Sequence, residues 1–279
     1  MTDMSEIVWI NGEVSDGRIP VTDSSVLRGD GCFEVLRAYK GEVFAIDDHL
    51  DRLERSAAQL EISLPPRDSI AGWVHSAAEA EPDGAIRVVV TRGSALPGAE
   101  PQTNVIVFSH RWERSVEQAR LALVRAPWHS GGSEWELRGA KVLSYAPNMA
   151  ASRSAQARGF DDALLMTDDG VILEGPTFSI AWVVDGVIET PSLDLGILDS
   201  ITRRHVIRLA RDMGHEVLEG IWKTTRLADA DEVLAVSTIR QVQPVIQIGD
   251  WSLEPGPVTA GLAIAFAQLV GSELSTQDV

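Results

Sequence analysis

The sequence predicts an α+β fold in which antiparallel sheet dominates. Strand-like runs occur in pairs that are joined by short turns, for which Asn11-Gly12, Lys40-Gly41 and Asp185-Gly186 are the candidates. Two-residue turns connect antiparallel strands, whereas parallel strands need a crossover of a dozen or more residues. Helical patterns lie between these pairs, and the chain has no repeat of fixed period, which excludes solenoids and propellers.

The first half of the chain predicts a small N-terminal α/β domain over residues 1–112. Strands are expected at residues 7–10, 32–39, 42–46, 85–91 and 104–108. We expect Asp47 to cap a helix that packs one apolar side, while Arg52 and Arg55 project elsewhere. A second helix is expected at residues 69–80.

A polar and charged stretch separates the two halves, and we expect residues 113–120 to form an interdomain connector. Residues 121–279 are expected to form a larger C-terminal domain. It begins with a strand at residues 121–124 and continues with a helix after Lys141. Two hairpins follow, at residues 163–173 and 179–189, and then an amphipathic helix at residues 201–213 that ends at Gly214.

The composition is that of a folded, soluble protein. The chain has 279 residues, of which 44% are hydrophobic, and no apolar run near the roughly 18 residues that a membrane span needs. The N-terminus is acidic and lacks a signal-peptide pattern, so we expect a cytoplasmic protein with no membrane partner. A net charge of −17 without a basic patch argues against a nucleic-acid partner.

Several common chemistries are missing from the sequence. It has no G-x-x-x-x-G-K-[ST], G-x-S-x-G or H-E-x-x-H motif. The six histidines are scattered and Cys32 is the single cysteine, so we expect neither a metal site nor an intramolecular disulfide. Only three of the 24 basic residues are lysines, namely Lys40, Lys141 and Lys223. Any lysine chemistry must use one of these three.

The informative stretch begins at Lys141 and reads KVLSYAPNMAASRSAQARGFDDALLMTDDGVILEG, so that Glu174 follows after two predicted strands. Together with DGCFEVLR, HLDRL, LDSITR and ADEVLAVSTIRQVQPV, this ordered set resembles the class IV aminotransferases, also called fold type IV enzymes of pyridoxal 5′-phosphate (PLP). The resemblance covers nearly the whole chain. It implies PLP as the cofactor, a homodimer, and a C-terminal domain with a barrel-like, largely antiparallel sheet.

The resemblance also assigns roles to single residues. Lys141 is expected to carry PLP as a Schiff base and to act as the general base, a role that burial favours by lowering a lysine pKa. Glu174 matches the acidic residue that faces the pyridine nitrogen and keeps the ring protonated, so that the ring accepts electron density from the substrate. Tyr145 is also assigned to the cofactor, although it stands one place before the tyrosine of branched-chain aminotransferases.

A phosphate site is implied as well. Arg52 matches the family's phosphate-binding arginine, and Thr238 matches a threonine of the same site. Ile201 and Thr202 open a predicted helix, whose first backbone N–H groups lack partners within the helix and can bind an anion.

Three activities fit this resemblance: aminotransfer on branched-chain L-amino acids or D-amino acids, aminotransfer on amines, and the lyase reaction that converts 4-amino-4-deoxychorismate to 4-aminobenzoate and pyruvate in folate precursor synthesis. The run AIRVVVTRGS looks more like the lyases, and KVLSYAPNMA is similar to actinobacterial proteins assigned as that lyase. We therefore expect the lyase, with an aminotransferase as the alternative. Arg28 and Arg92 are expected to bind the small amino substrate. A catalytically silent PLP-fold interaction protein is a third possibility, which the presence of Lys141 and Glu174 disfavours.

Overall fold

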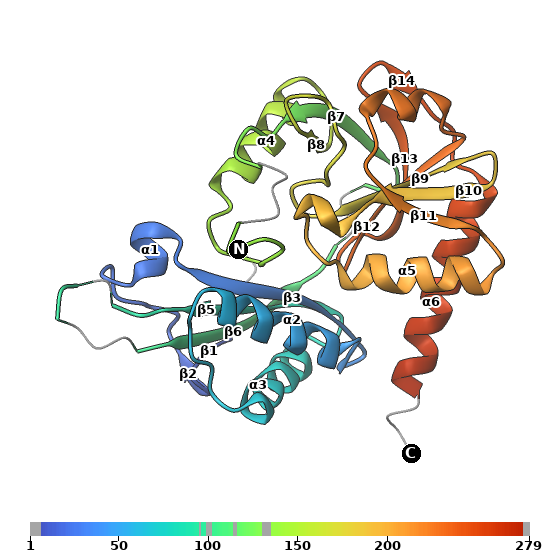
Figure 1. Cartoon of the computed structure of the whole chain (residues 1–279). Coiled ribbons are helices and arrows are strands. Elements are labelled where there is room, and N and C mark those ends of the chain that lie inside the picture. Colours follow the sequence, from blue (N-terminus) through green and yellow to red (C-terminus); the bar gives the residue numbers. More distant parts are fainter. Residues whose placement is uncertain (1–6, 95, 99–101, 114–115, 130–134, 276–279) are drawn as a thin grey trace. The chain divides into compact units, whose positions relative to one another are not determined.

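A computed structural model describes residues 7–94, 96–98, 102–113, 116–129 and 135–275 of the chain (Figure 1). These residues divide into two units. The N-terminal unit contains the described residues up to 113 together with 140–145, and the C-terminal unit contains those of 116–139 and 146–275. Residues 114 and 115 of the expected connector lie outside the described residues. The segment that carries Lys141 thus groups with the N-terminal unit, which the expected linear division into domains did not anticipate.

A six-stranded antiparallel sheet forms the base of the N-terminal unit, in the order β2-β1-β6-β5-β3-β4. Its strands are β1 (Val8–Ile10), β2 (Glu13–Ser15), β3 (Gly31–Tyr39), β4 (Glu42–Val43), β5 (Gly84–Thr91) and β6 (Asn104–Arg111). Two helices, α2 (Ile46–Gln59) and α3 (Arg67–Ala80), pack on this sheet and share its apolar core. A short helix that the sequence did not predict, α1 (Ser24–Arg28), precedes β3.

The hairpin turns follow the predicted dipeptides. Asn11 and Gly12 have φ values of 54° and 88°, and Lys40 and Gly41 have φ values of 53° and 88°. Positive φ at both central residues is the mark of the type I′ turn, whose twist matches that of the strands on either side. Glycine fills the second position in each turn because a side chain is disfavoured in this conformation.

Helix α2 differs from the expectation in two respects. Its N-cap residue is Ala45, not Asp47, and no side chain caps it. Asp47 lies in the first turn instead, where its carboxylate accepts a hydrogen bond of 3.0 Å from Arg67. The prediction that Arg52 projects away from the packed side was also wrong, because Arg52 is buried and only 5% exposed.

The C-terminal unit contains a mixed sheet in the order β11-β10-β9-β12-β13-β7-β8, with β14 paired to β13. Its strands are β7 (Ala119–Arg125), β8 (Asp162–Met166), β9 (Ser179–Val184), β10 (Val187–Pro191), β11 (Val217–Gly220), β12 (Glu232–Ser237), β13 (Gln241–Ile248) and β14 (Trp251–Ser252). Four pairings are antiparallel and three are parallel, namely β10–β11, β13–β7 and β7–β8.

Two isolated bridges give this sheet its barrel-like form. Ile172 pairs with Met166 of β8, and Val171 pairs with Lys223, which follows β11. The segment between Asp169 and Glu174 therefore connects the two ends of the strand order. This segment is the predicted second arm of the hairpin that leads to Glu174.

Three helices complete the C-terminal unit: α4 (Ala146–Ala157), α5 (Ile201–Asp212) and α6 (Pro257–Ser275), along with the 3₁₀ turns η1 (Leu193–Leu195) and η2 (Thr224–Asp229). By length and composition, α6 is long and apolar enough to cross a membrane, which the sequence analysis did not anticipate. It packs on β12, β13 and α5. The carboxylate of Glu232 accepts hydrogen bonds from the first-turn N–H groups of Val258 and Thr259, at 3.0 and 2.7 Å.

Candidate active site

Main-chain hydrogen bonds fix the segment that carries Lys141 against β3. The N–H of Phe33 donates to the carbonyl of Lys141 at 3.0 Å, and the N–H of Leu143 donates to the carbonyl of Gly31 at 2.8 Å. On the other side, the N–H of Lys141 donates to the hydroxyl of Ser56 in α2 at 3.1 Å. The position of the Lys141 backbone is therefore set by both the sheet and α2.

Two aromatic rings lie beside the Lys141 side chain. Its Nζ atom is 4.5 Å from the ring centroid of Phe33 and 5.8 Å from that of Tyr145. The two rings meet edge to face with their centroids 5.2 Å apart. Aromatic faces attract a cation at such distances and restrict where a flexible side chain points. Tyr145 thus lies next to the predicted cofactor-bearing lysine, and its contact with the cofactor itself stays a prediction.

Arg52 belongs to a buried polar cluster with Glu34 and His49. The guanidinium donates through Nε and Nη2 to the two carboxylate oxygens of Glu34, at 2.7 and 2.8 Å. The Nδ1 atom of His49 lies 2.8 Å from the same carboxylate. Burial alone would raise the pKa of Glu34, but the charge and hydrogen bonds of Arg52, with those of His49, hold it well below its usual value. Burial lowers the pKa of His49, so the ring is neutral at physiological pH.

The sequence analysis missed Glu34, His49 and Ser56 as parts of this site. His49, Arg52 and Ser56 follow each other at spacings of three and four residues and are all buried on one side of α2. This polar stripe is the signal that the apolar spacing of the helix concealed. The charge of Lys141 also lowers the pKa of His49, which shows that the stripe lies close to the lysine.

The two predicted substrate arginines have different surroundings in the N-terminal unit. Arg28 ends α1 and is exposed. Arg92 forms an ion pair with Asp30, with bonds of 2.7 Å from Nε and 3.2 Å from Nη2. It also donates to the carbonyls of Leu60 and Glu61, which follow α2. Arg92 therefore has a structural role that the sequence did not predict, and substrate binding by either arginine stays a prediction.

Glu174 is fixed within the C-terminal unit. One carboxylate oxygen accepts a hydrogen bond of 3.1 Å from the N–H of Leu198, in the loop that leads into α5. The next residue is Gly175, where an added Cβ atom would lie 2.2 Å from the ring of Phe178. Only glycine fits this close approach, so the Glu-Gly pair sets the turn that presents the carboxylate.

The predicted phosphate residues of the C-terminal unit lie at two turns. Ser200 caps α5 by accepting a hydrogen bond from the N–H of Arg203, and Ile201 and Thr202 are the first residues of the helix and are buried. Thr238 lies in the turn between β12 and β13. Opposite the end of β12 is Ser179, whose hydroxyl is buried and has no hydrogen-bond partner among the described residues.

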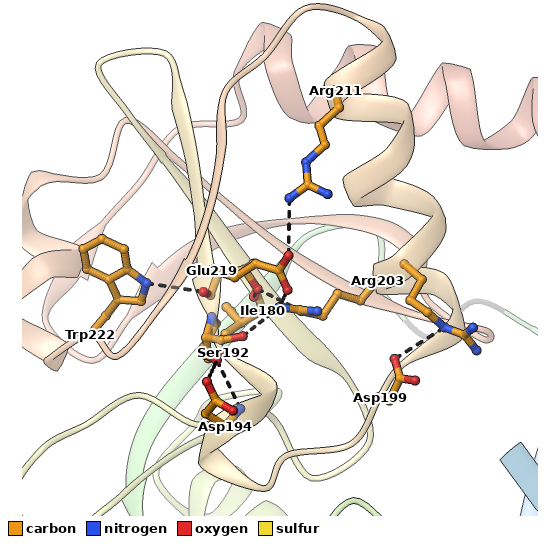
Figure 2. Close-up of polar contacts among 11 residues, drawn as sticks. Ile180, Ser192, Asp194, Asp199, Arg203, Arg211, Glu219 and Trp222 are labelled. Atoms are coloured by element: carbon orange, nitrogen blue, oxygen red, sulfur yellow. Dashed lines mark hydrogen bonds and ion pairs between the residues drawn. The ribbon is translucent and has the colours of Figure 1, made fainter.

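Arg203 fastens the start of α5 to the neighbouring strands (Figure 2). Its Nε atom donates to the hydroxyl of Thr190 at 3.2 Å, and its Nη2 atom donates to the carbonyl of Pro191 at 2.7 Å and to Glu219 at 2.9 Å. Arg211, near the other end of the helix, donates to the second oxygen of Glu219 at 3.3 Å. The sequence analysis did not single out this network.

A pocket of about 400 Å³ lies along the same helix and is lined by residues of α5 and its surroundings: Leu193, Asp199, Arg203, Arg204, Ile207, Arg208, Arg211, Asp212 and Glu219. None of these lining residues is a predicted site residue. Three of the lining arginines are paired with neighbouring acids, as Arg203–Glu219, Arg211–Glu219 and Arg204–Asp199. We therefore regard this pocket as the outer side of an ion-pair network.

The donor set fits PLP. The N-terminal unit supplies an amine on Lys141, and the C-terminal unit supplies the Glu174 carboxylate, the start of α5 and the hydroxyl of Thr238. An aldehyde, a pyridine nitrogen and a phosphate are the groups that these donors suit. No cluster of three histidine, cysteine or acidic side chains able to hold a metal ion occurs in the described part of the chain.

Comparison with known proteins agrees with this donor set. The sequence model of the amino-transferase class IV family matches residues 31–248. The bifunctional aminodeoxychorismate lyase / D-amino acid transaminase of Mycobacterium tuberculosis is 28% identical, over 96% of this chain and 98% of its own. The branched-chain aminotransferase of Thermoproteus uzoniensis with norvaline has a TM-score of 0.86 at 30% identity, and 95% of each chain is covered. A hypothetical aminotransferase from Mycobacterium tuberculosis, in its alpha-ketoglutarate and PMP bound form, has a TM-score of 0.87 at 25% identity, and 96% of this chain and 99% of that chain are covered.

Fold and donor set together define a PLP-dependent enzyme of fold type IV. The chain belongs to the class IV aminotransferase family, whose members include both aminotransferases and aminodeoxychorismate lyases. The family, the fold and the cofactor expected from the sequence are thereby confirmed.

Proposed function

We propose that the enzyme is a lyase that converts 4-amino-4-deoxychorismate to 4-aminobenzoate and pyruvate. The similarity to a relative that carries this activity supports the proposal, as do the runs AIRVVVTRGS and KVLSYAPNMA. The same relative is also named for transamination of D-amino acids, so this reaction is the second candidate. We further propose a cytoplasmic homodimer.

The observation that carries the proposal is the placement of Lys141. Its backbone is held on β3 and α2, and its amine lies beside two aromatic rings near the buried cluster of Arg52, Glu34 and His49. Bound PLP supplies an electron sink for the substrate. Lys141 is proposed to hold the cofactor and then, once the substrate has displaced it, to take the proton from the substrate carbon next to the nitrogen.

Roles for the remaining residues follow from the chemistry of their donors. Glu174 is proposed to accept a hydrogen bond from the pyridine N–H and to favour the protonated ring. Arg52, the first N–H groups of α5 at Ile201 and Thr202, and the hydroxyl of Thr238 are proposed to bind the phosphate. The two candidate reactions part after the proton is taken: loss of enolpyruvate leaves an aromatic ring, whereas return of the proton to the cofactor leads to amino transfer.

The cofactor role of Lys141 is tested by absorption spectroscopy on the purified protein after addition of PLP. We expect a visible band from lysine-bound cofactor that is lost in Lys141→Ala. Lys40→Ala is the matched control, because Lys40 is an exposed lysine in the β3–β4 turn. A band that persists unchanged in Lys141→Ala would show that another residue holds the cofactor.

The reaction is tested with two incubations of the same PLP-loaded protein. One contains 4-amino-4-deoxychorismate and is assayed for 4-aminobenzoate and pyruvate. The other contains D-alanine and 2-oxoglutarate and is assayed for glutamate. The proposal expects 4-aminobenzoate, and glutamate as the sole product would make the chain an aminotransferase instead.

A further inference from the structure

Arg203 occupies an unusual place for a buried arginine. It follows Ile201 and Thr202 directly, and it is only 3% exposed. Its side chain makes hydrogen bonds that lead away from α5, to Thr190, Pro191 and Glu219 on the two adjacent strands β10 and β11. The first turn of α5 is thus tied to two strands by one side chain (Figure 2).

Arg211 offers a comparison within the same helix. It binds the same carboxylate of Glu219, but its side chain is 53% exposed and lies at the end of α5 remote from Thr202. Exposed ion pairs contribute little, since solvent screens them and two long side chains must be ordered. The two arginines therefore share one acceptor but differ in burial and in distance from the predicted phosphate residues.

The N-terminus of a helix binds an anion only if its backbone N–H groups point at one place. Because these groups move with the first turn, their aim depends on what fixes that turn to the rest of the fold. Ser200 fixes the turn internally through its bond to the N–H of Arg203. The Arg203 side chain fixes it externally, through a planar fork that a lysine cannot reproduce.

We propose that Arg203 is a positioning residue for the cofactor phosphate, which holds the first turn of α5 where Ile201 and Thr202 meet that group. This inference rests on the proposed function. It assigns no direct contact between Arg203 and the cofactor. Its consequence is selective: loss of Arg203 weakens binding of the phosphate and leaves the binding of the pyridine ring and aldehyde largely intact.

Spectroscopic titration of the apoenzyme with two probes tests this selectivity. The first probe is PLP, and the second is pyridoxal, which has the same ring and aldehyde but no phosphate. We expect Arg203→Gln and Arg203→Lys to weaken PLP binding by about tenfold or more and pyridoxal binding by less than about threefold. In Arg211→Gln, the matched control, both affinities are expected to stay within about twofold of wild type.

Thr190→Val provides a milder variant in case both Arg203 variants fail to fold. It removes the acceptor of Arg203 Nε but keeps the arginine, and we expect about a threefold selective loss of PLP affinity. Equal losses for PLP and pyridoxal in the folded variants would overturn the inference, since they indicate general damage. Unchanged PLP affinity would overturn it as well. A wild-type protein that binds neither probe through Lys141 would instead contradict the proposed function.

Discussion

Glu34 and Arg52 form a two-point ion pair in the interior of the N-terminal unit, with bonds of 2.7 and 2.8 Å between groups that are almost completely removed from solvent. Removing one partner of a buried pair leaves the other charge without compensation, which typically costs about 3–5 kcal/mol. We expect Glu34→Gln to lower the free energy of unfolding by about this amount in chemical denaturation.

The control for this variant is Glu54→Gln in α2, the helix that carries Arg52. Glu54 also pairs with an arginine, Arg67, but its side chain is 47% exposed. Its replacement is expected to cost about 0.5 kcal/mol or less. Similar costs for the two variants would mean that burial does not strengthen the Glu34–Arg52 pair.

The buried cluster makes stability depend on pH. His49 has a lowered pKa through burial, so below its usual value of 6.5 the unfolded chain binds a proton that the folded chain does not. Stability is therefore lost as the pH falls from about 7 towards 5, by at most about 1.4 kcal/mol per pH unit for one proton. Glu34 also has a lowered pKa, and its contribution is lost as the pH falls below its usual 4.5.

Urea unfolding at several pH values from about 5 to about 7.5 measures this dependence. We expect His49→Gln to have a shallower slope of unfolding free energy against pH than wild type. His75→Gln, at an exposed position of α3, is expected to keep the wild-type slope. Parallel slopes in wild type and His49→Gln would show that His49 does not change its protonation on unfolding.

Gly175 provides a steric prediction about Glu174. A Cβ atom at this position would lie 2.2 Å from the ring of Phe178, so Gly175→Ala must displace the ring or the turn. We expect a loss of about 1–3 kcal/mol in unfolding free energy together with weaker PLP binding. Gly271→Ala in α6 is the control, because an added Cβ there meets nothing within 4 Å, and it is expected to leave stability unchanged or to raise it by up to about 1 kcal/mol.

Arg92 can act on substrate, on stability or on both, and a double-mutant cycle with Asp30 separates these roles. Because the two side chains are paired at 2.7 Å, we expect Arg92→Gln and Asp30→Asn to destabilise the protein non-additively, with a coupling of about 0.5–3 kcal/mol. A purely structural arginine changes KM little in either variant. A large rise in KM in Arg92→Gln alone would support the predicted substrate contact.

Local patterns in the sequence were sufficient for much of the fold. The turns at Asn11-Gly12, Lys40-Gly41 and Asp185-Gly186 have positive φ at both residues, because their conformation depends on only a few neighbouring atoms. The strands on either side also lie close to their predicted bounds. The helix before Gly214 ends one residue earlier than predicted, at Asp212.

Contacts between distant parts of the chain were beyond the reach of such patterns. Periodicity identifies the apolar side of α2 but not a buried Arg52, whose burial depends on Glu34 in another element. The pairing of Val142 with Cys32 joins positions more than a hundred residues apart, and no local signal encodes it. The order of Lys141, Glu174, Thr202 and Thr238 was predictable because the family resemblance already contains this long-range information.

The bonding of the Lys141 segment to β3 has a consequence for how the chain is made. The carbonyl of Gly31 and the N–H of Phe33 find their partners in residues that leave the ribosome more than a hundred positions later. A nascent or truncated chain that stops near residue 113 therefore has an unsatisfied stretch of strand edge, which is a known starting point for aggregation. An expressed fragment of residues 1–113 is expected to be poorly soluble, and a synthetic peptide of residues 140–145 added in trans is expected to protect it.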